Sequence, residues 1–204
     1  MKSSVKSVCR YSSGKRVYQG DIYRDLRIID YDYDNNEEGI FELEIPYLIV
    51  LSQDCDLQQD YDSGEKYTQL EDKENEDKLR SIHDKFIPSV LLCPAFPAEQ
   101  VRVGIHLKNY NNLLMDSKGS ENKSKWKNIL QNETPRYHFI IGDTNLQVPE
   151  LVLDFKRYYT VPKKYFYDKF ENYYLASLNE LYREELSRRF TNYLSRIGLP
   201  VFDD

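Results

Sequence analysis

The sequence has few cysteines, a single tryptophan and no long apolar run. Its three cysteines (Cys9, Cys55 and Cys93) are odd in number and have no CxxC spacing, so they do not form a disulfide framework and fit a reducing compartment. No run approaches the roughly 18 apolar residues of a membrane span. The basic stretch 1–16 lacks the apolar centre of a secretory signal. These absences predict a cytoplasmic protein without a membrane segment.

The composition is that of a soluble globular chain of one core with an appended helical region. Charged residues make up 30% and hydrophobic residues 40% of 204 residues, and the net charge is −6. This charge does not favour nucleic-acid binding by the molecule as a whole, although it leaves room for a local basic patch. Eighteen tyrosines bury rings while keeping hydroxyls in water. We therefore expect a groove or interface rich in tyrosine, and a protein partner or a homodimer.

One stretch organises the rest of the chain. The apolar run Tyr47–Leu51 follows Pro46 and precedes the polar cluster Ser52-Gln53-Asp54-Cys55-Asp56. An uninterrupted aliphatic run with such boundaries predicts a strand buried on both faces. The polar cluster is then expected in a turn where the strand emerges, a usual place for a functional site.

Further alternating or apolar segments predict a β-rich α+β fold. The segments 22–29 and 40–45 flank the Asn-rich stretch 30–39, which predicts a hairpin. Four more strands are expected at 86–94, 137–141, 151–155 and 157–161.

Two insertions and a final helix complete the expected layout. Residues 58–84 are highly charged and predict a solvated insertion with a short helix near 70–80. Residues 98–133 predict a helical insertion anchored by Trp126. The spacing of apolar residues from Leu178 to Ile197 predicts a long helix, with Ser177 to Glu180 as its capping box.

Four short motifs resemble the MazF/PemK-like toxin family, whose fold is a small SH3-like barrel. They are Gly20-Asp21-Ile22, Pro46–Ser52, Val90–Pro94 and Leu151–Val161. The resemblance implies a partly open SH3-like barrel over 17–166, with the charged insertion 58–84 and the helical insertion 98–133. Residues 1–16 are then a flexible basic lead-in, and 167–204 a helical extension.

Members of that family are mostly endoribonucleases, but two of its catalytic positions are not matched. The family's Arg before the proline-led strand is replaced by Glu44 and Ile45, and its Thr/Ser after the later proline by Ala95-Phe96. We therefore expect a non-catalytic module that binds protein or nucleic acid in a toxin–antitoxin or defence-type system. The alternative is a toxin-like endoribonuclease that cleaves single-stranded RNA.

Catalysis by attack of a 2′-OH needs an acid or base and a cation on the developing charge. The candidate catalytic residues are Ser52, Asp54, Asp56, Arg136 and His138. Arg136 and His138 supply a cation and a base from another strand. His138 is equally explained as a hydrogen-bonded histidine of the core or of a strand edge.

Cys55 has two flanking aspartates, which raise the pKa of a thiol and disfavour a nucleophilic role. A small buried side chain within a turn explains it as well. A zinc site from Cys55, Cys93 and His138 is the metal alternative, and Asp54 and Asp56 also fit a hard cation or a turn cap. No resident cofactor is predicted.

The segment 156–165 alternates basic and aromatic residues, which is typical of surfaces that hold single-stranded nucleic acid. The candidate residues are Lys156, Arg157, Tyr159, Lys163 and Lys164. A strand with one solvated face gives the same pattern.

Overall fold

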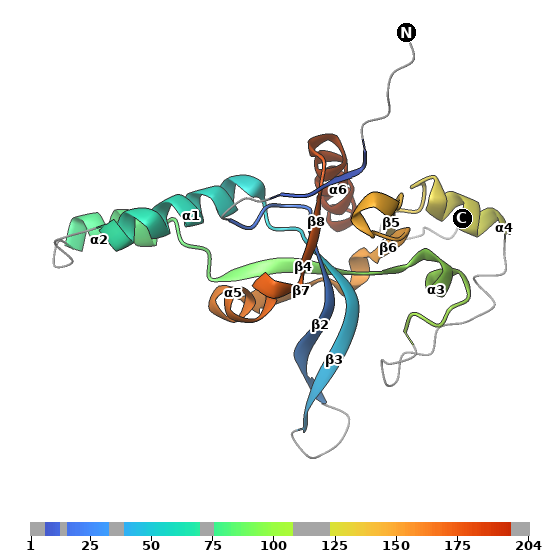
Figure 1. Cartoon of the computed structure of the whole chain (residues 1–204), viewed down its shortest axis with the longest axis horizontal. Helices are drawn as coiled ribbons and strands as arrows, with labels where there is room; N and C mark the ends of the chain where they lie inside the picture. Colours follow the sequence, from blue (N-terminus) through green and yellow to red (C-terminus); the bar gives the residue numbers. More distant parts are fainter. Residues whose placement is uncertain (1–6, 13–15, 33–38, 70–75, 108–122, 197–204) are drawn as a thin grey trace, which may run out of the picture.

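The computed structural model describes residues 7–12, 16–32, 39–69, 76–107 and 123–196. They form a mixed α+β fold with an eight-stranded antiparallel sheet and six α-helices (Figure 1). The strands are β1 (Cys9–Arg10), β2 (Asp21–Asp32), β3 (Gly39–Val50), β4 (Ser89–Pro97), β5 (Tyr137–Ile140), β6 (Leu151–Asp154), β7 (Tyr159–Pro162) and β8 (Tyr174–Leu178). The helices are α1 (Asp54–Gln69), α2 (Glu76–His83), α3 (Ala98–Arg102), α4 (Lys123–Leu130), α5 (Lys163–Phe170) and α6 (Glu180–Leu194). Short 3-10 turns follow β5 (Thr144–Leu146), β6 (Phe155–Arg157) and α5 (Glu171–Tyr173).

The sheet is open. Its strand order is β1-β8-β2-β3-β4-β6-β5, and β7 pairs with β4 beside β6. The end strands β1 and β5 do not pair with each other in the described part of the chain, so the sheet is not closed into a barrel. The short strand β1 orders part of the segment that we expected to be a loose lead-in, because Cys9 and Arg10 pair with Leu178 and Ser177 of β8.

The expected strand 47–51 is confirmed as the centre of the fold. Leu48, Ile49 and Val50 at the end of β3 are fully buried, and Leu51 is nearly so. Ile49 belongs to a core on one face of the sheet, to which α6 contributes Leu186 and Phe190. Leu48 and Val50 belong to a second core on the other face, which includes α1 and α5 residues. Because a core covers each face of the sheet here, the sequence of this strand does not alternate between apolar and polar residues.

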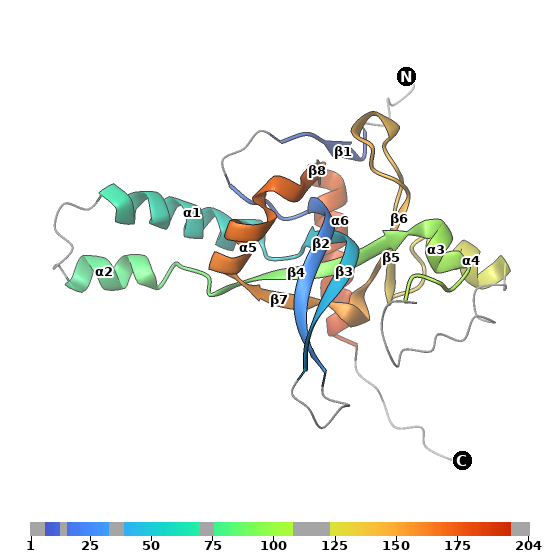
Figure 2. The same cartoon turned by 60° about the horizontal axis from the view of Figure 1, so that its bottom comes forward.

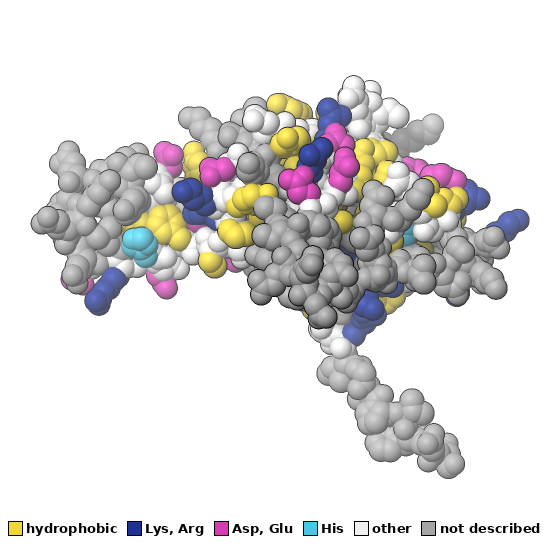
Figure 3. Space-filling view, turned by 90° about the horizontal axis from the view of Figure 1, so that it is seen from below, with side chains coloured by type: hydrophobic (Ala, Val, Ile, Leu, Met, Phe, Trp, Pro, Cys, Tyr) yellow, Lys and Arg dark blue, Asp and Glu magenta, His cyan; other side chains and the backbone are white. Residues whose placement is uncertain are grey.

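The β2–β3 hairpin is confirmed, and it extends beyond the sheet as a two-stranded arm (Figures 1 and 2). The positions of Asp25 and Pro46 lie opposite each other, between the pairs Arg24–Tyr47 and Leu26–Ile45. Asp25 has φ 58°. Pro46 has no N–H for the ladder, so the pairing is interrupted at this point. Across the arm, the exposed side chains of Arg27 and Glu42 form an ion pair (3.4 Å). Seen from below, acidic, basic and apolar side chains are interspersed on the coloured part of the surface (Figure 3).

The charged segment after β3 contains a helix where a turn was expected, since α1 begins at Asp54. It forms the antiparallel-looking pair α1 and α2, which project side by side from one end of the sheet (Figures 1 and 2). Leu57, Asp60 and Ser63 recur every third residue on α1 and are buried. Two of these three residues are polar, so the sequence of α1 lacks the apolar stripe that indicates an amphipathic helix.

The C-terminal helix is confirmed, but its predicted capping box is wrong. Ser177 lies in β8 and donates a hydrogen bond to Asp21, so it cannot cap a helix. Helix α6 begins at Glu180, with Asn179 as the N-cap residue. The helical insertion is confirmed for α3 and α4, and Trp126 of α4 packs against a third core around Phe96 and Val152. Residues 108–122 lie outside the described part.

Candidate functional site

Ser52 and Asp54 lie at the junction between β3 and α1. The Ser52 hydroxyl accepts a hydrogen bond from the backbone N–H of Leu91 (2.8 Å), which ties the junction to β4. Asp54 and Asp56 lie in the first turn of α1, where negatively charged carboxylates interact favourably with the helix dipole. The expected turn is therefore the start of a helix, and Cys55 is exposed in its first turn, so the expectation of a buried side chain is wrong.

Asp54 is held by two arginines from distant parts of the sequence. Arg16 forms a bidentate pair with it (3.1 and 3.0 Å), and Arg183 of α6 approaches to 3.5 Å. Partial burial alone would raise the pKa of Asp54, but the hydrogen bonds and positive charge of Arg16 lower it below its ordinary value. Arg16 also lies over the ring of Tyr18, 3.8 Å from its centroid. Asp54 is thus a fully ionised structural anchor that joins the N-terminal segment, α1 and α6.

A second carboxylate, Asp21, lies buried beside this junction. It accepts hydrogen bonds from the Ser177 hydroxyl and from the backbone N–H of Tyr18 (2.8 Å). Ser177 in turn shares a hydrogen bond with the Tyr174 hydroxyl (2.9 Å). Burial raises the pKa of Asp21 to about 6. This group titrates near neutral pH because it is desolvated, and it was not among the residues expected from the sequence.

Arg136 precedes β5 and is engaged by an internal carboxylate. It forms a bidentate ion pair with Asp154 at the end of β6 (2.7 and 2.5 Å), and Arg157 approaches the same carboxylate to 3.3 Å. The side chain of Asp154 is only 1% exposed. The hydrogen bond to Asp154 raises the pKa of Arg136. Arg136 is thus a permanent cation whose charge is partly neutralised within the fold.

His138 lies in the middle of β5 and is buried. Its Nδ1 has no hydrogen-bond partner among the described residues, and its ring stacks on Phe155 (centroids 6.1 Å apart). Burial, together with the charge of Arg189, lowers the pKa of His138 to about 3. The imidazole is therefore neutral and shielded from solvent, which are the properties of a core histidine.

The strand register separates His138 from Ser52. His138 pairs with Leu153, Leu153 with Ala95, and Ala95 with Tyr47. Ser52 lies five residues beyond Tyr47. Strand spacings of about 4.8 Å and a rise of about 3.3 Å per residue put the two residues on the order of 20 Å apart. The structure therefore brings Ser52, Asp54 and Asp56 together, and Arg136 with His138, as two separate groups.

The three residues of the metal alternative are also dispersed. Cys55 is exposed on α1, whereas Cys93 is buried in β4 with its Sγ 3.5 Å from the carbonyl oxygen of Asp154. Burial raises the pKa of the Cys93 thiol well above its ordinary value. Within the described ranges, no three His, Cys, Asp or Glu side chains form a group that could hold a metal ion.

The basic and aromatic residues of 156–165 divide between two ends of the strand β7. Lys163 bonds Asp60 of α1 (2.7 Å), and Tyr159 packs against the core that contains Val90. Arg157 is paired with Asp154, while Lys156 and Lys164 are exposed. The segment therefore does not present its five candidate side chains on one surface.

Three residues that pair with polar groups in the structure were not among the expected site residues: Arg16, Asp21 and Asp154. Asp21 belongs to the Gly20-Asp21-Ile22 motif of the family resemblance, so the sequence did single out this position. Nothing in the sequence indicated the pairing of Arg16 or Asp154, because that pairing joins segments far apart in the chain. No known protein-family model matches the sequence, and no curated protein is similar to it. Of the helices described, none has the length and apolar character to span a membrane.

Proposed function

We propose that this chain is a non-catalytic binding module built on a divergent, partly open SH3-like barrel of the MazF/PemK type. In this proposal it acts in the cytoplasm, in a toxin–antitoxin or defence-type system. The antiparallel succession of β2, β3 and β4, with β6 and β7 on the outer edge of β4, is compatible with such a barrel opened between its end strands.

One observation carries the non-catalytic part of the proposal: the groups that the cleavage reaction needs are used inside the fold. The cation Arg136 is bound bidentately to Asp154. The base His138 is buried, and its pKa of about 3 makes it a poor proton acceptor near neutral pH. The two are on the order of 20 Å from Ser52 by strand register. A general base must reach the proton that it removes, and this arrangement does not allow it.

The test is an RNA cleavage assay with the purified full chain and its His138→Ala and Arg136→Ala variants. We expect no cleavage of single-stranded RNA by the wild-type protein and no growth arrest when it is expressed. Cleavage by the wild-type protein that disappears in both variants would establish the endoribonuclease and overturn the proposal.

The binding part of the proposal predicts a stable complex with a macromolecule. Light scattering after size-exclusion chromatography, with and without candidate partners, measures this directly. A protein that stays monomeric and binds neither nucleic acid nor protein contradicts a binding role.

A further inference from the structure

We infer that the surface at the C-terminal end of α6 binds single-stranded nucleic acid. We call it the Tyr–Arg surface, and it consists of Arg136, Lys156, Tyr158, Tyr193 and Arg196. The inference rests on the proposed function, because it names the partner of the binding module. From the sequence, Lys156 was expected to bind nucleic acid and Arg136 was a candidate catalytic residue.

Two tyrosines provide the aromatic part of this surface. Tyr158 packs edge-to-face on Phe190 (centroids 5.6 Å apart), and its side chain is 45% exposed. Tyr193 lies about one turn after Phe190 in α6, and its ring packs against that of Phe155 (centroids 5.8 Å apart). The buried phenylalanines fix both rings before any ligand arrives, so stacking on them loses little side-chain entropy.

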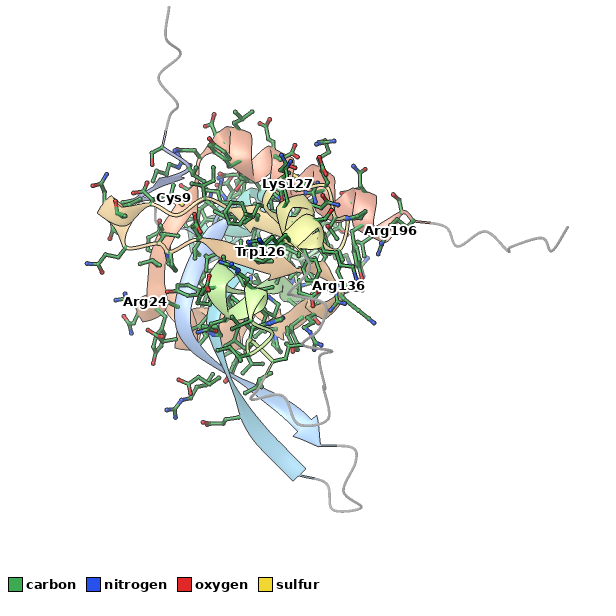
Figure 4. All side chains as sticks on the ribbon, turned by 90° about the vertical axis from the view of Figure 1, so that its right-hand side faces the viewer. Cys9, Arg24, Trp126, Lys127, Arg136 and Arg196 are labelled. Atoms are coloured by element: carbon green, nitrogen blue, oxygen red, sulfur yellow. The ribbon has the colours of Figure 1, made fainter. Side chains whose placement is uncertain are left out.

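Two arginines lie beside Tyr193, and the exposed Lys156 precedes Tyr158 by two residues. The Arg196 guanidinium lies over the Tyr193 ring at 4.3 Å, and its Nε donates to the Tyr193 carbonyl oxygen (3.1 Å). Arg136 lies over the Tyr137 ring at 5.0 Å and close enough to Tyr193 for the two side chains to interact electrostatically. Arg136 and Arg196 lie on the same flank of the molecule (Figure 4).

The local charge of this surface is positive although the chain is acidic. Arg196 and Lys156 form no ion pair with any residue that the structure describes. The nearby carboxylate of Asp154 is 1% exposed and lies beneath the surface. The acidic excess is elsewhere: residues 54–83 hold ten Asp or Glu and four Lys or Arg, a difference that equals the whole net charge of −6. Helices α1 and α2 of that segment project from one end of the sheet (Figures 1 and 2).

The combination of fixed rings, two cations without an ion pair (Lys156 and Arg196) and the partly neutralised Arg136 matches single-stranded nucleic acid. Phosphates bind the cations and exposed bases stack on the tyrosines, and neither contact requires a particular sequence. A duplex offers phosphates but keeps its bases stacked inside, so it leaves the tyrosines without a ligand. A protein partner normally needs a desolvated apolar centre at its interface, whereas here cations lie beside the rings.

The test is fluorescence anisotropy with labelled single-stranded DNA and RNA of about 15 nucleotides, in the range that single binding folds cover. Two phosphates neutralised by the unpaired cations Lys156 and Arg196 predict a salt slope of about −1.4, so that the affinity falls roughly sevenfold between about 50 and 200 mM salt. Arg196→Glu and Tyr158→Leu are each expected to weaken binding on the order of tenfold.

Two matched variants separate binding from folding. Arg188→Glu changes an exposed arginine on the same helix, which is paired with Glu185, and is expected to bind as the wild-type protein does. Tyr158→Phe keeps the ring and is expected to retain affinity, while the melting temperatures of all variants report their folding.

Three results overturn the inference: no binding by the wild-type protein at low salt, equal affinities for Arg196→Glu and Arg188→Glu, or a duplex bound as tightly as the single strands. These outcomes differ from failure of the proposed function. Cleavage of the RNA contradicts the non-catalytic role even if the Tyr–Arg surface binds it. Absence of nucleic-acid binding, with a stable protein complex, overturns only the inference.

Discussion

Two buried carboxylates, Asp21 and Asp154, are stabilised in different ways at the scale of single residues. Asp21 accepts hydrogen bonds from Ser177 and Tyr18, and burial raises its pKa to about 6. Asp154 instead receives two guanidinium groups, from Arg136 and Arg157. Burial destabilises the anionic form of Asp21, whereas the ion pairs of Asp154 with the two arginines need its negative charge. The two carboxylates are therefore expected to respond differently to neutral substitution.

The stability of the fold is expected to fall between about pH 4 and pH 6 by the contribution of Asp21. A pKa raised from 3.8 to about 6 means that the folded state binds this proton more tightly than the unfolded state. Folding is therefore favoured below pH 4, and roughly 3 kcal/mol of this advantage is lost as the pH rises through 6. Asp21→Asn should be more stable than the wild-type protein at pH 7 and lack this pH dependence.

Urea unfolding of both proteins at a series of pH values measures the effect. Asp54, whose pKa is lowered, changes the free energy of unfolding with pH in the opposite direction. This contribution is the same in both proteins, so it cancels when one curve of unfolding free energy against pH is subtracted from the other. Parallel curves for wild type and Asp21→Asn would show that Asp21 titrates normally in the folded protein.

Asp154→Ala is expected to destabilise the fold by about 3–5 kcal/mol, because it leaves two arginines without their shared buried carboxylate. The control is Glu185→Ala, which breaks the exposed pair with Arg188 and should change the free energy of unfolding by less than about 1 kcal/mol. Chemical denaturation measures both. Similar losses for the two variants would mean that burial of the ion pair is unimportant.

At the scale of elements, the β2–β3 arm depends on an irregular position. Tyr23 and Leu26 of β2 both belong to the core that contains Leu48, although they are three residues apart and a regular strand would point them to opposite faces. On β3, Ile45 and Leu48 show the same change of phase. The interruption at Asp25 and Pro46 lies between them on each strand, and Asp25 adopts φ 58° there. This position therefore turns the apolar side of the arm towards the core.

Substitutions at Asp25 test this interpretation. Glycine adopts positive φ without strain, so Asp25→Gly should leave the melting temperature unchanged or slightly higher. Asp25→Val places a β-branched residue in the left-handed region and should destabilise the fold by about 1–3 kcal/mol. Thermal unfolding followed by circular dichroism measures both. Because Asp25 is exposed, loss of its side-chain contacts cannot account for a difference between the two.

At the scale of the whole molecule, the cores on the two faces of the sheet share the same strands. Leu48 and Ile49 are adjacent in β3, yet they belong to different cores. A sheet that carries one core on each face should unfold as a unit, since neither core keeps its strands when the other is lost. The charge, in contrast, is unevenly distributed: residues 54–83 carry a net charge of −6, whereas the Tyr–Arg surface is basic.

Leu48→Ala and Ile49→Ala are each expected to lower the free energy of unfolding by about 2–5 kcal/mol and to shift one and the same transition. Tyrosine fluorescence and far-UV circular dichroism should give coincident curves for both variants. A second transition that responds to only one of the substitutions would show that the two cores unfold independently.

The sequence alone determined the elements whose patterns are local. The buried strand 47–51, the 22–45 hairpin and the terminal helix follow from runs of apolar residues and their spacing, and the structure contains all three. The sequence did not reveal α1, because two of its buried positions hold the polar residues Asp60 and Ser63. Asp60 accepts hydrogen bonds from Ile87 and Lys163, which lie far along the chain. The sequence pattern also placed a helix cap at Ser177, which is a strand residue bonded to Asp21.

The site was decided by tertiary structure. Whether Ser52 lies beside His138, or Arg136 has a free charge, depends on strand order and on the position of Asp154, and neither is encoded in the spacing of neighbouring residues. The Tyr–Arg surface likewise joins residues from before β5, after β6 and the end of α6. Local periodicity fixes which residues share a face of one element, but the energy that pairs a charge with its partner depends on distance in space, and only the folded sheet sets that distance.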